Sequence, residues 1–345
     1  MHVPVIALDS GEEAQFHVEI STPTEASASA VDPALPTILF IHGVYMAQQI
    51  FESQFSDPRL RQFNLVAVDR LGHGDSKGTV TEGTVPEKSA VDIKRVMDAL
   101  NVPSFHLLGL GIGTIVAQEI AIQYPDAIKS LTLVSTAPYA EPPEVNEGRA
   151  EIFEYWQEMG MSSDISFLDD IVFGAMQLVF HEDLNRRSNA IRDITLQQTF
   201  RAWLGSMENI LVARKVNLNF FMNRRLLTAK ELSAIRCPVQ LIHGETDIAY
   251  PLEHTLAVEQ ELRAAGVNVT GVHQVRGPHY MVISYPDEVN PYLRDLVLQA
   301  EKRKDSPLPI DGRLPTPWTE VLTERGFYTA ESDEDSASDD DIVIG

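Results

Sequence analysis

A glycine-rich turn, Gly109-Leu110-Gly111-Ile112-Gly113, follows one apolar run of the sequence and precedes a helical one. Glycines at a junction of this kind could belong to a dinucleotide-binding loop. The turn lacks the G-x-G-x-x-G spacing of such a loop, and no partner acid follows about 20 residues later. The sequence therefore predicts no dinucleotide, and no cofactor is predicted from any other segment.

The remaining candidate metal ligands and nucleophiles give no site. Cys237 has no basic cluster or helix start beside it and is predicted to be an inert core thiol. His73 is predicted to shape a turn, and His243 to be buried at the end of a strand. No spacing with Asp, Glu or Cys that would suit a metal is found for His2, His17, His106, His181, His254 and His273, so we predict no metal site.

The elements that must position the glycine-rich turn alternate between two types. Runs that are apolar throughout predict strands buried on both faces, as in a parallel sheet, and proline-started helical patterns lie between them. This alternation predicts an α/β fold with a mostly parallel, doubly wound sheet. The predicted strands are 37–41, 65–68, 105–108, 131–134, 239–242 and 269–275, and the predicted helices are 86–100, 114–124, 252–265 and 286–302. Residues 3–8 and 16–20 are predicted to form a hairpin around Asp9-Ser10-Gly11.

The alternation stops at one point in the chain. Residues 141–230 carry helical patterns with aromatic and methionine stripes, which indicate either packing surface or the wall of an apolar pocket. We expect a helical lid over 141–230 inserted into a core formed by 1–140 and 231–302. Residues 303–330 form a proline-rich segment in which a short docked helix and a solvated linker both fit the pattern. Residues 331–345 are predicted to be a disordered acidic tail.

The composition limits the partners of the protein. The 345 residues carry a formal charge of −23, which disfavours nucleic acids and anionic membrane surfaces. One cysteine excludes an internal disulfide framework, and no apolar stretch is long enough to span a bilayer. The sequence has no secretory signal, so we expect a cytoplasmic protein. The acidic tail is a candidate surface for a basic protein partner.

The layout and its short motifs resemble the α/β-hydrolase fold family, in its lidded, esterase-like branch, over residues 1–302. The resemblance implies a nucleophile, an acid and a histidine in that order, with backbone N–H groups that hold an oxyanion. Five landmarks carry it in the family's order: His42-Gly43 with Val44 as oxyanion donor, the D-x-x-G-x-G-x-S loop Asp69–Ser76, the elbow Gly109–Gly113 with Ile112 as the second donor, Asp247, and His279.

The nucleophile itself is missing from this pattern. The family reads G-x-S-x-G where this sequence has glycine at position 111, and neither Leu110 nor Ile112 can attack a substrate. Glycine relieves the backbone strain of an elbow residue with positive φ, so it is a natural residue for an elbow that no longer carries a nucleophile. The N-myc downstream-regulated family resembles this chain in that one feature.

The predicted His279–Asp247 pair permits two interpretations. It is either a dyad that activates water or a substrate proton, or a buried polar pair kept because losing one partner would strand the other. We expect a non-hydrolytic protein that binds a small apolar, carbonyl-containing molecule near Gly43, Val44, Gly111 and Ile112. The alternatives are an active hydrolase or lyase, either with its native serine replaced in this sequence or working through His279 and Asp247 alone, and an interaction protein that works through its tail.

Overall fold

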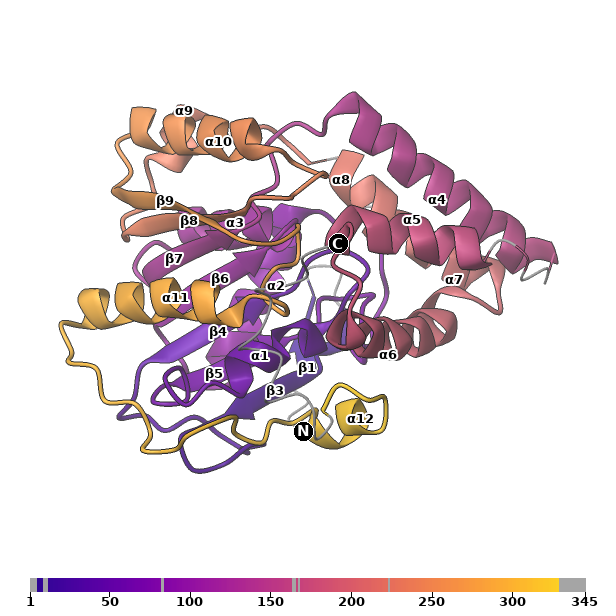
Figure 1. Cartoon of the computed structure of the whole chain (residues 1–345). Coiled ribbons are helices and arrows are strands. Elements are labelled where there is room, and N and C mark those ends of the chain that lie inside the picture. Colours follow the sequence, from indigo (N-terminus) through magenta and orange to yellow (C-terminus); the bar gives the residue numbers. More distant parts are fainter. Residues whose placement is uncertain are drawn as a thin grey trace, which may run out of the picture.

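A seven-stranded sheet forms the centre of the protein (Figure 1). The structure is a computed structural model that describes residues 5–8, 12–81, 84–162, 166, 168–222 and 224–328. Strand β3 runs antiparallel to β5, and every other neighbouring pair is parallel, which confirms the predicted α/β fold. The strand order is β3(Val18–Ser21), β5(Asn64–Val68), β4(Thr37–Ile41), β6(Phe105–Leu110), β7(Ile128–Val134), β8(Val239–Gly244), β9(Val269–Val275).

Both faces of the sheet are buried under helices. Along β4, Leu39 and Ile41 pack into one hydrophobic cluster, whereas Ile38 and Phe40 pack into a second one. This alternation follows from the period of two in a strand and explains why the predicted strands are apolar throughout. The first cluster includes residues of α2(Pro86–Ala99), α3(Gly113–Gln123) and α10(Leu252–Ala264), and the second includes residues of α1(Glu52–Phe55) and α11(Pro286–Glu301).

The N-terminal hairpin differs from the prediction. Strand β1(Val5–Ala7) pairs with β2(Glu13–Gln15), and the predicted partner strand is instead β3 at the edge of the main sheet. The prediction of one hairpin over 3–8 and 16–20 is therefore wrong. Val18 and Ile20 are buried in the main core, and the backbone of their strand pairs with β5. The predicted turn Asp9-Ser10-Gly11 lies outside the described residues.

A helical insert separates β7 from β8 and packs beside the carboxyl end of the sheet (Figure 1). The side chain of Asn185 starts α6 by accepting hydrogen bonds from the N–H groups of Arg187 and Ser188. Phe173 is 63% exposed and Met222 is 53% exposed, so the aromatic and methionine stripes are only partly buried. The insert contains α4(Pro143–Ser162), α5(Leu168–Phe180), α6(Arg186–Trp203), α7(Met207–Arg214), the π-helix η3(Lys215–Asn219) and α8(Phe220–Met222), and α9(Ala229–Leu232) leads back to the sheet.

The proline-rich segment ends in a short helix, α12(Thr319–Thr323), which packs on the body of the protein. The ring of Trp318 lies 4.8 Å from that of Phe55, centroid to centroid, and Leu322 and Phe327 are buried beside them. The predicted disordered tail 331–345 lies outside the described residues. The division of the chain into core, lid, segment and tail stays a prediction.

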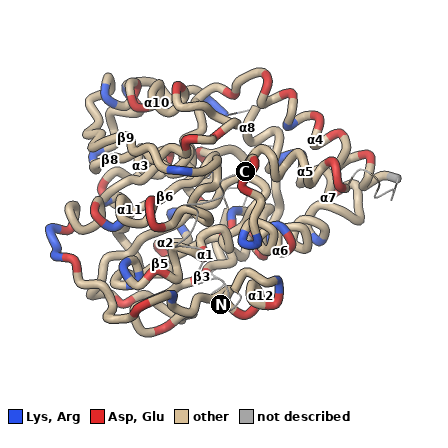
Figure 2. Tube along the Cα trace, viewed as in Figure 1, with Lys and Arg blue, Asp and Glu red and all other residues tan. Residues whose placement is uncertain are grey.

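Charged residues lie mainly on the outer helices and loops (Figure 2). Some of them form pairs within one helix, such as Lys94 with Asp98 at 2.5 Å. Within the described part of the chain, no helix combines the length and the apolar character that crossing a membrane requires.

Candidate active site

The glycine-rich turn connects β6 to α3 in the way that an elbow requires. Gly111 has φ +55°, and its N–H donates to the carbonyl of Val134 at 2.9 Å. A β-carbon on Gly113 would lie 2.5 Å from the carbonyl oxygen of Ile41, so no side chain fits at that flank. A residue with positive φ between two tightly packed neighbours is a strained position, and glycine adopts it without cost.

His279 and Asp247 are brought together beside this turn, although 32 residues separate them in sequence. The His279 Nδ1 and Asp247 Oδ2 atoms are 2.7 Å apart, and the two side chains are 3% and 0% exposed. The other oxygen of Asp247 accepts hydrogen bonds from the backbone N–H groups of Ala249 and Tyr250, each at 3.0 Å. These contacts fix the carboxylate, which in turn fixes the ring. A β-carbon built on Gly111 would lie 3.0 Å from His279 Nε2, so this nitrogen faces the empty nucleophile position.

Tyr280 fills the space between the elbow and the predicted oxyanion loop. Its hydroxyl donates to the carbonyl of Val44 at 3.0 Å, and a β-carbon on Gly43 would overlap that hydroxyl. The ring also lies 3.3 Å from the position of a Gly111 β-carbon, at Cε1, and stacks on His279 with centroids 5.1 Å apart. Burial raises the pKa of Tyr280, which keeps the phenol neutral.

The position of Tyr280 in this space could not be predicted from the sequence, because the residue after a histidine carries no pattern of its own. The insert holds Tyr280 in place: its N–H donates to the carbonyl of Val179 in α5 at 2.9 Å. Val44 and Ile112, the two predicted oxyanion donors, are both buried, and Ile112 is the residue directly before α3.

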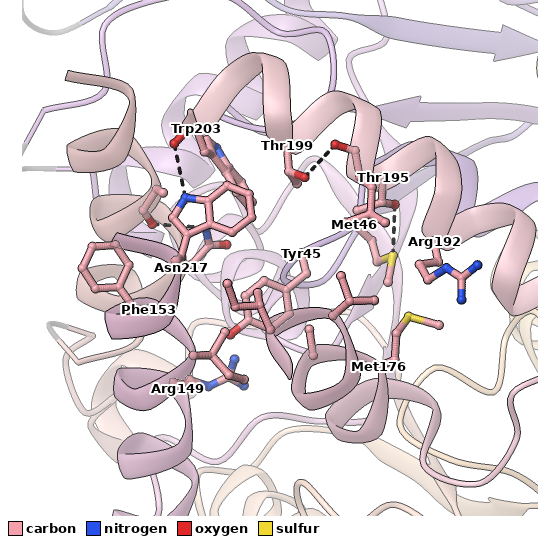
Figure 3. A pocket seen from close by; sticks show the side chains of 17 residues that line it. Tyr45, Met46, Arg149, Phe153, Met176, Arg192, Thr195, Thr199, Trp203 and Asn217 are labelled. Carbon is pink, nitrogen blue, oxygen red and sulfur yellow. Dashed lines mark hydrogen bonds between the residues drawn. The ribbon is translucent and has the colours of Figure 1, made fainter. Parts of the chain in front are cut away.

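The pocket of the insert lies apart from this pair. It is formed by side chains from α4, α5, α6 and α7, with Tyr45 and Met46 from the loop after β4 (Figure 3). Its lining includes none of Gly111, Ile112, Val44 or His279. This pocket is therefore a different place from the expected ligand site near Gly43, Val44, Gly111 and Ile112, which stays a prediction. Tyr280 occupies the space above the elbow.

The aspartate of the D-x-x-G-x-G-x-S loop, Asp69, is the centre of a buried network. Its Oδ1 accepts from the N–H of Gln48 at 2.9 Å, and its Oδ2 accepts from the N–H of Asp75 at 3.0 Å. The ring of His17 lies 2.8 Å from the same Oδ2. His17, Asp69 and Asp75 offer ligand atoms within 4.8 Å of one another, a grouping that the sequence spacing did not reveal. Because N–H donors already engage Asp69, we interpret the network as a support for the loop, and the lack of a metal site stays a prediction.

His17 makes the stability of the protein depend on pH. Burial alone would lower its pKa, but hydrogen bonds to Asp69 and Glu19 outweigh burial and raise the pKa of His17 to about 10. A raised pKa stabilises the fold fully below the ordinary value of 6.5, and this stabilisation is lost as the pH rises through about 10. The free energy of unfolding should therefore fall by up to about 1.4 kcal/mol per pH unit over that window.

Urea unfolding at several pH values measures this fall. His17→Gln removes the titrating ring, so its difference from the parent should shrink as the pH rises from about 7 to about 10. His254→Gln, on the half-exposed surface of α10, serves as the matched control and should follow the parent at every pH. If the free energy of unfolding changed with pH in parallel for the parent and His17→Gln, that result would contradict the protonated state of His17.

The chain is similar in sequence to proteins from plants and bacteria. The chain is 24% identical over 286 residues to the probable lysophospholipase BODYGUARD 1 of Arabidopsis thaliana, covering 76% of this chain and 58% of that protein. It is also 24% identical over 295 residues to the putative carbamate hydrolase RutD of Agrobacterium fabrum, covering 83% of this chain and 100% of that one. The chain thus spans little more than half the length of the BODYGUARD relatives that it matches.

Solved structures give the same fold. A thermophilic esterase from Thermogutta terrifontis superposes with a TM-score of 0.65 at 19% identity, over 87% of this chain and 99% of the esterase. An enol-lactonase from Burkholderia xenovorans superposes with a TM-score of 0.62 at 19% identity, over 85% and 99% of the two chains. The family model for the alpha/beta hydrolase fold matches residues 36–269, a range that includes the elbow and Asp247. The strand order, the elbow after β6 and this match together show that the chain belongs to the alpha/beta hydrolase fold family.

Proposed function

We propose that the protein is a non-hydrolytic member of this family that binds a small apolar molecule carrying a carbonyl oxygen. One observation carries the proposal: the elbow residue facing His279 Nε2 is Gly111, which has no side chain to attack a substrate. Covalent hydrolysis in this family needs a nucleophile at that position.

The pocket of the insert supports binding as the remaining function. The pocket is partly open to solvent, and its empty space together with that open part is about 680 Å³. Apolar side chains make up most of its wall, among them Phe153, Trp156 and Met176. Burial of an alkyl chain against such a wall is favourable by about 0.8 kcal/mol for each CH₂ group.

A second candidate is an enzyme that works through the dyad alone. The observation in its favour is the 2.7 Å contact between His279 and Asp247, with Asp247 held by two N–H donors, which is the arrangement of a general base and its orienting acid. Such an enzyme would activate water or a substrate proton directly. Its activity would require His279, whereas the binding function would not.

Two of the three tryptophans of the chain line the pocket, so intrinsic fluorescence can test binding. We expect methyl octyl ketone to bind with a Kd on the order of 10–100 μM, a value that corresponds to roughly 0.6 kcal/mol per non-hydrogen atom. Binding should change the emission of Trp156 and of Trp203, the second of which is labelled in Figure 3.

Trp318 provides the matched control, because it packs on Phe55 under α12 and does not line the pocket. Trp318→Phe should keep the full fluorescence response, and Trp203→Phe should lose a large part of it. A chain that shows no response, and no heat of binding in calorimetry, would contradict the proposed function.

A further inference from the structure

Three charged side chains meet beside the pocket of the insert, and no sequence motif indicates any of them. Glu141 is shared by two arginines: its Oε1 lies 2.9 Å from Arg149 Nε, and its Oε2 lies 2.7 Å from Arg224 Nη1. The three side chains are between 2% and 6% exposed. Among the residues that the structure describes, neither arginine is paired with a second carboxylate. The group therefore carries one positive charge in excess.

Nearby phenols do not neutralise that charge. Tyr250 donates to both oxygens of Glu141 at 2.9 Å and accepts from Arg149 Nη2 at 3.2 Å, but burial raises the pKa of Tyr250 to about 12. The Tyr45 hydroxyl is directed toward Arg149 (Figure 3), and burial raises the pKa of Tyr45 as well. Both phenols are thus neutral near pH 7. A buried cation without a full counter-charge is costly, and this cost favours an anionic ligand.

The guanidinium of Arg149 also has a nitrogen that no well-aligned hydrogen bond engages. The residue is 3% exposed and lines the pocket. Its buried Nη1 lacks a partner of good hydrogen-bond geometry among the described residues, and the Tyr45 hydroxyl is the further group that contacts the guanidinium. Its other two nitrogens are used by Glu141 and Tyr250. The ring of Phe221 lies 3.8 Å from the guanidinium carbon and holds the group in place. One positive charge in excess matches a monoanion better than a dianion, which would need two cations.

We infer that the pocket takes a carboxylate amphiphile, with its carboxylate on Arg149 Nη1 and its alkyl chain along the apolar wall. The inference rests on the proposed function, because it names the class of ligand for the same pocket. A hydrogen bond to a charged group is stronger than one between neutral groups. The carboxylate form of a ligand should therefore bind more tightly than a neutral molecule of the same length.

Decanoate and methyl octyl ketone are the two probes, because they have similar alkyl chains and differ in charge. With the parent protein at pH 7.5 and below micelle-forming concentrations, calorimetry should give at least a tenfold lower Kd for decanoate. If neither probe binds, the proposed function fails. If the ketone binds and decanoate binds no more tightly, the proposed function survives and the present inference is overturned.

The variant Arg149→Met tests whether Arg149 binds the carboxylate of the ligand. The variant should fold, because Glu141 retains Arg224 as its partner. This variant should bind both probes with similar Kd values, and Arg149→Lys should recover part of the preference for decanoate. Arg214→Met, an exposed position at the end of α7, is the matched control and should keep the tenfold preference.

A variant of a second pocket arginine, Arg192, distinguishes two positions for the carboxylate of the ligand, one on Arg149 and one at the rim of the pocket. Its side chain is 35% exposed and already pairs with Asp193 at 2.8 Å. If Arg192→Met abolished the preference for decanoate while Arg149→Met kept it, the carboxylate would lie at the rim, and the assignment to Arg149 would be overturned.

Discussion

Replacing Glu141 with glutamine is expected to lower the free energy of unfolding by about 3 to 5 kcal/mol. The charge of Glu141 is the counter-charge for both Arg149 and Arg224, so its loss leaves two buried cations close together. Burial alone would raise the pKa of Glu141, but Arg149 and Arg224 outweigh burial and lower it. The charged carboxylate is therefore stabilised by these two partners. Chemical unfolding with a two-state fit measures the change.

Glu147→Gln is the matched control, since Glu147 is an exposed acid on α4, the helix that begins two residues after Glu141. Its effect should stay within about 0.5 kcal/mol, as for most surface substitutions. Equal effects of the two variants would mean that the Glu141 cluster adds nothing to stability. Such a result would contradict an uncompensated buried charge beside the pocket.

Gly111→Ser is expected to give the largest change in activity. The new β-carbon would lie 3.0 Å from His279 Nε2, so the serine hydroxyl can reach the nitrogen that would accept its proton. We expect reaction with a small fluorophosphonate and with p-nitrophenyl acetate at least about 100-fold faster than for the parent, the lower range for a positioned base. The cost should be about 1 to 3 kcal/mol, because residue 111 has φ +55° and close neighbours.

Gly111→Ala separates the backbone cost from the chemistry. It should destabilise the protein as much as serine does and should remain unreactive, because it adds the β-carbon without the hydroxyl. His279→Ala in the Gly111→Ser background should remove the gain. If Gly111→Ser folds and is as inert as Gly111→Ala, then His279 and Asp247 have lost the geometry of a base and its orienting acid.

The sheet could be predicted from the sequence because its strands are apolar on both faces, and each predicted strand from residue 37 onward lies within one that forms. The edge strand β3 was assigned to the wrong partner, since a short alternating run does not specify which strand it pairs with. The positions of His279 and Asp247 relative to the elbow followed from the order of the family's landmarks. Their 2.7 Å contact is consistent with that order.

The buried charges could not be predicted in the same way. Arg149 lies in a helix rich in acids, where a charged residue is usually solvated, and only the packing of the insert shows that it is buried. His17 and Asp69 are 52 residues apart, so no local spacing joins them. The position of the pocket could not be predicted from the sequence either, because it depends on the ring of Tyr280, which fills the space above Gly111.

Ester turnover by the unaltered protein is the most direct test of the central claim, that the elbow no longer supports hydrolysis. The substrates should include a p-nitrophenyl ester, a lysophospholipid and a carbamate, which represent the activities named for the relatives. We predict that the parent and His279→Ala turn over each substrate at the same background rate. Turnover by the parent that exceeds background and disappears in His279→Ala would contradict the account and establish the dyad as catalytic.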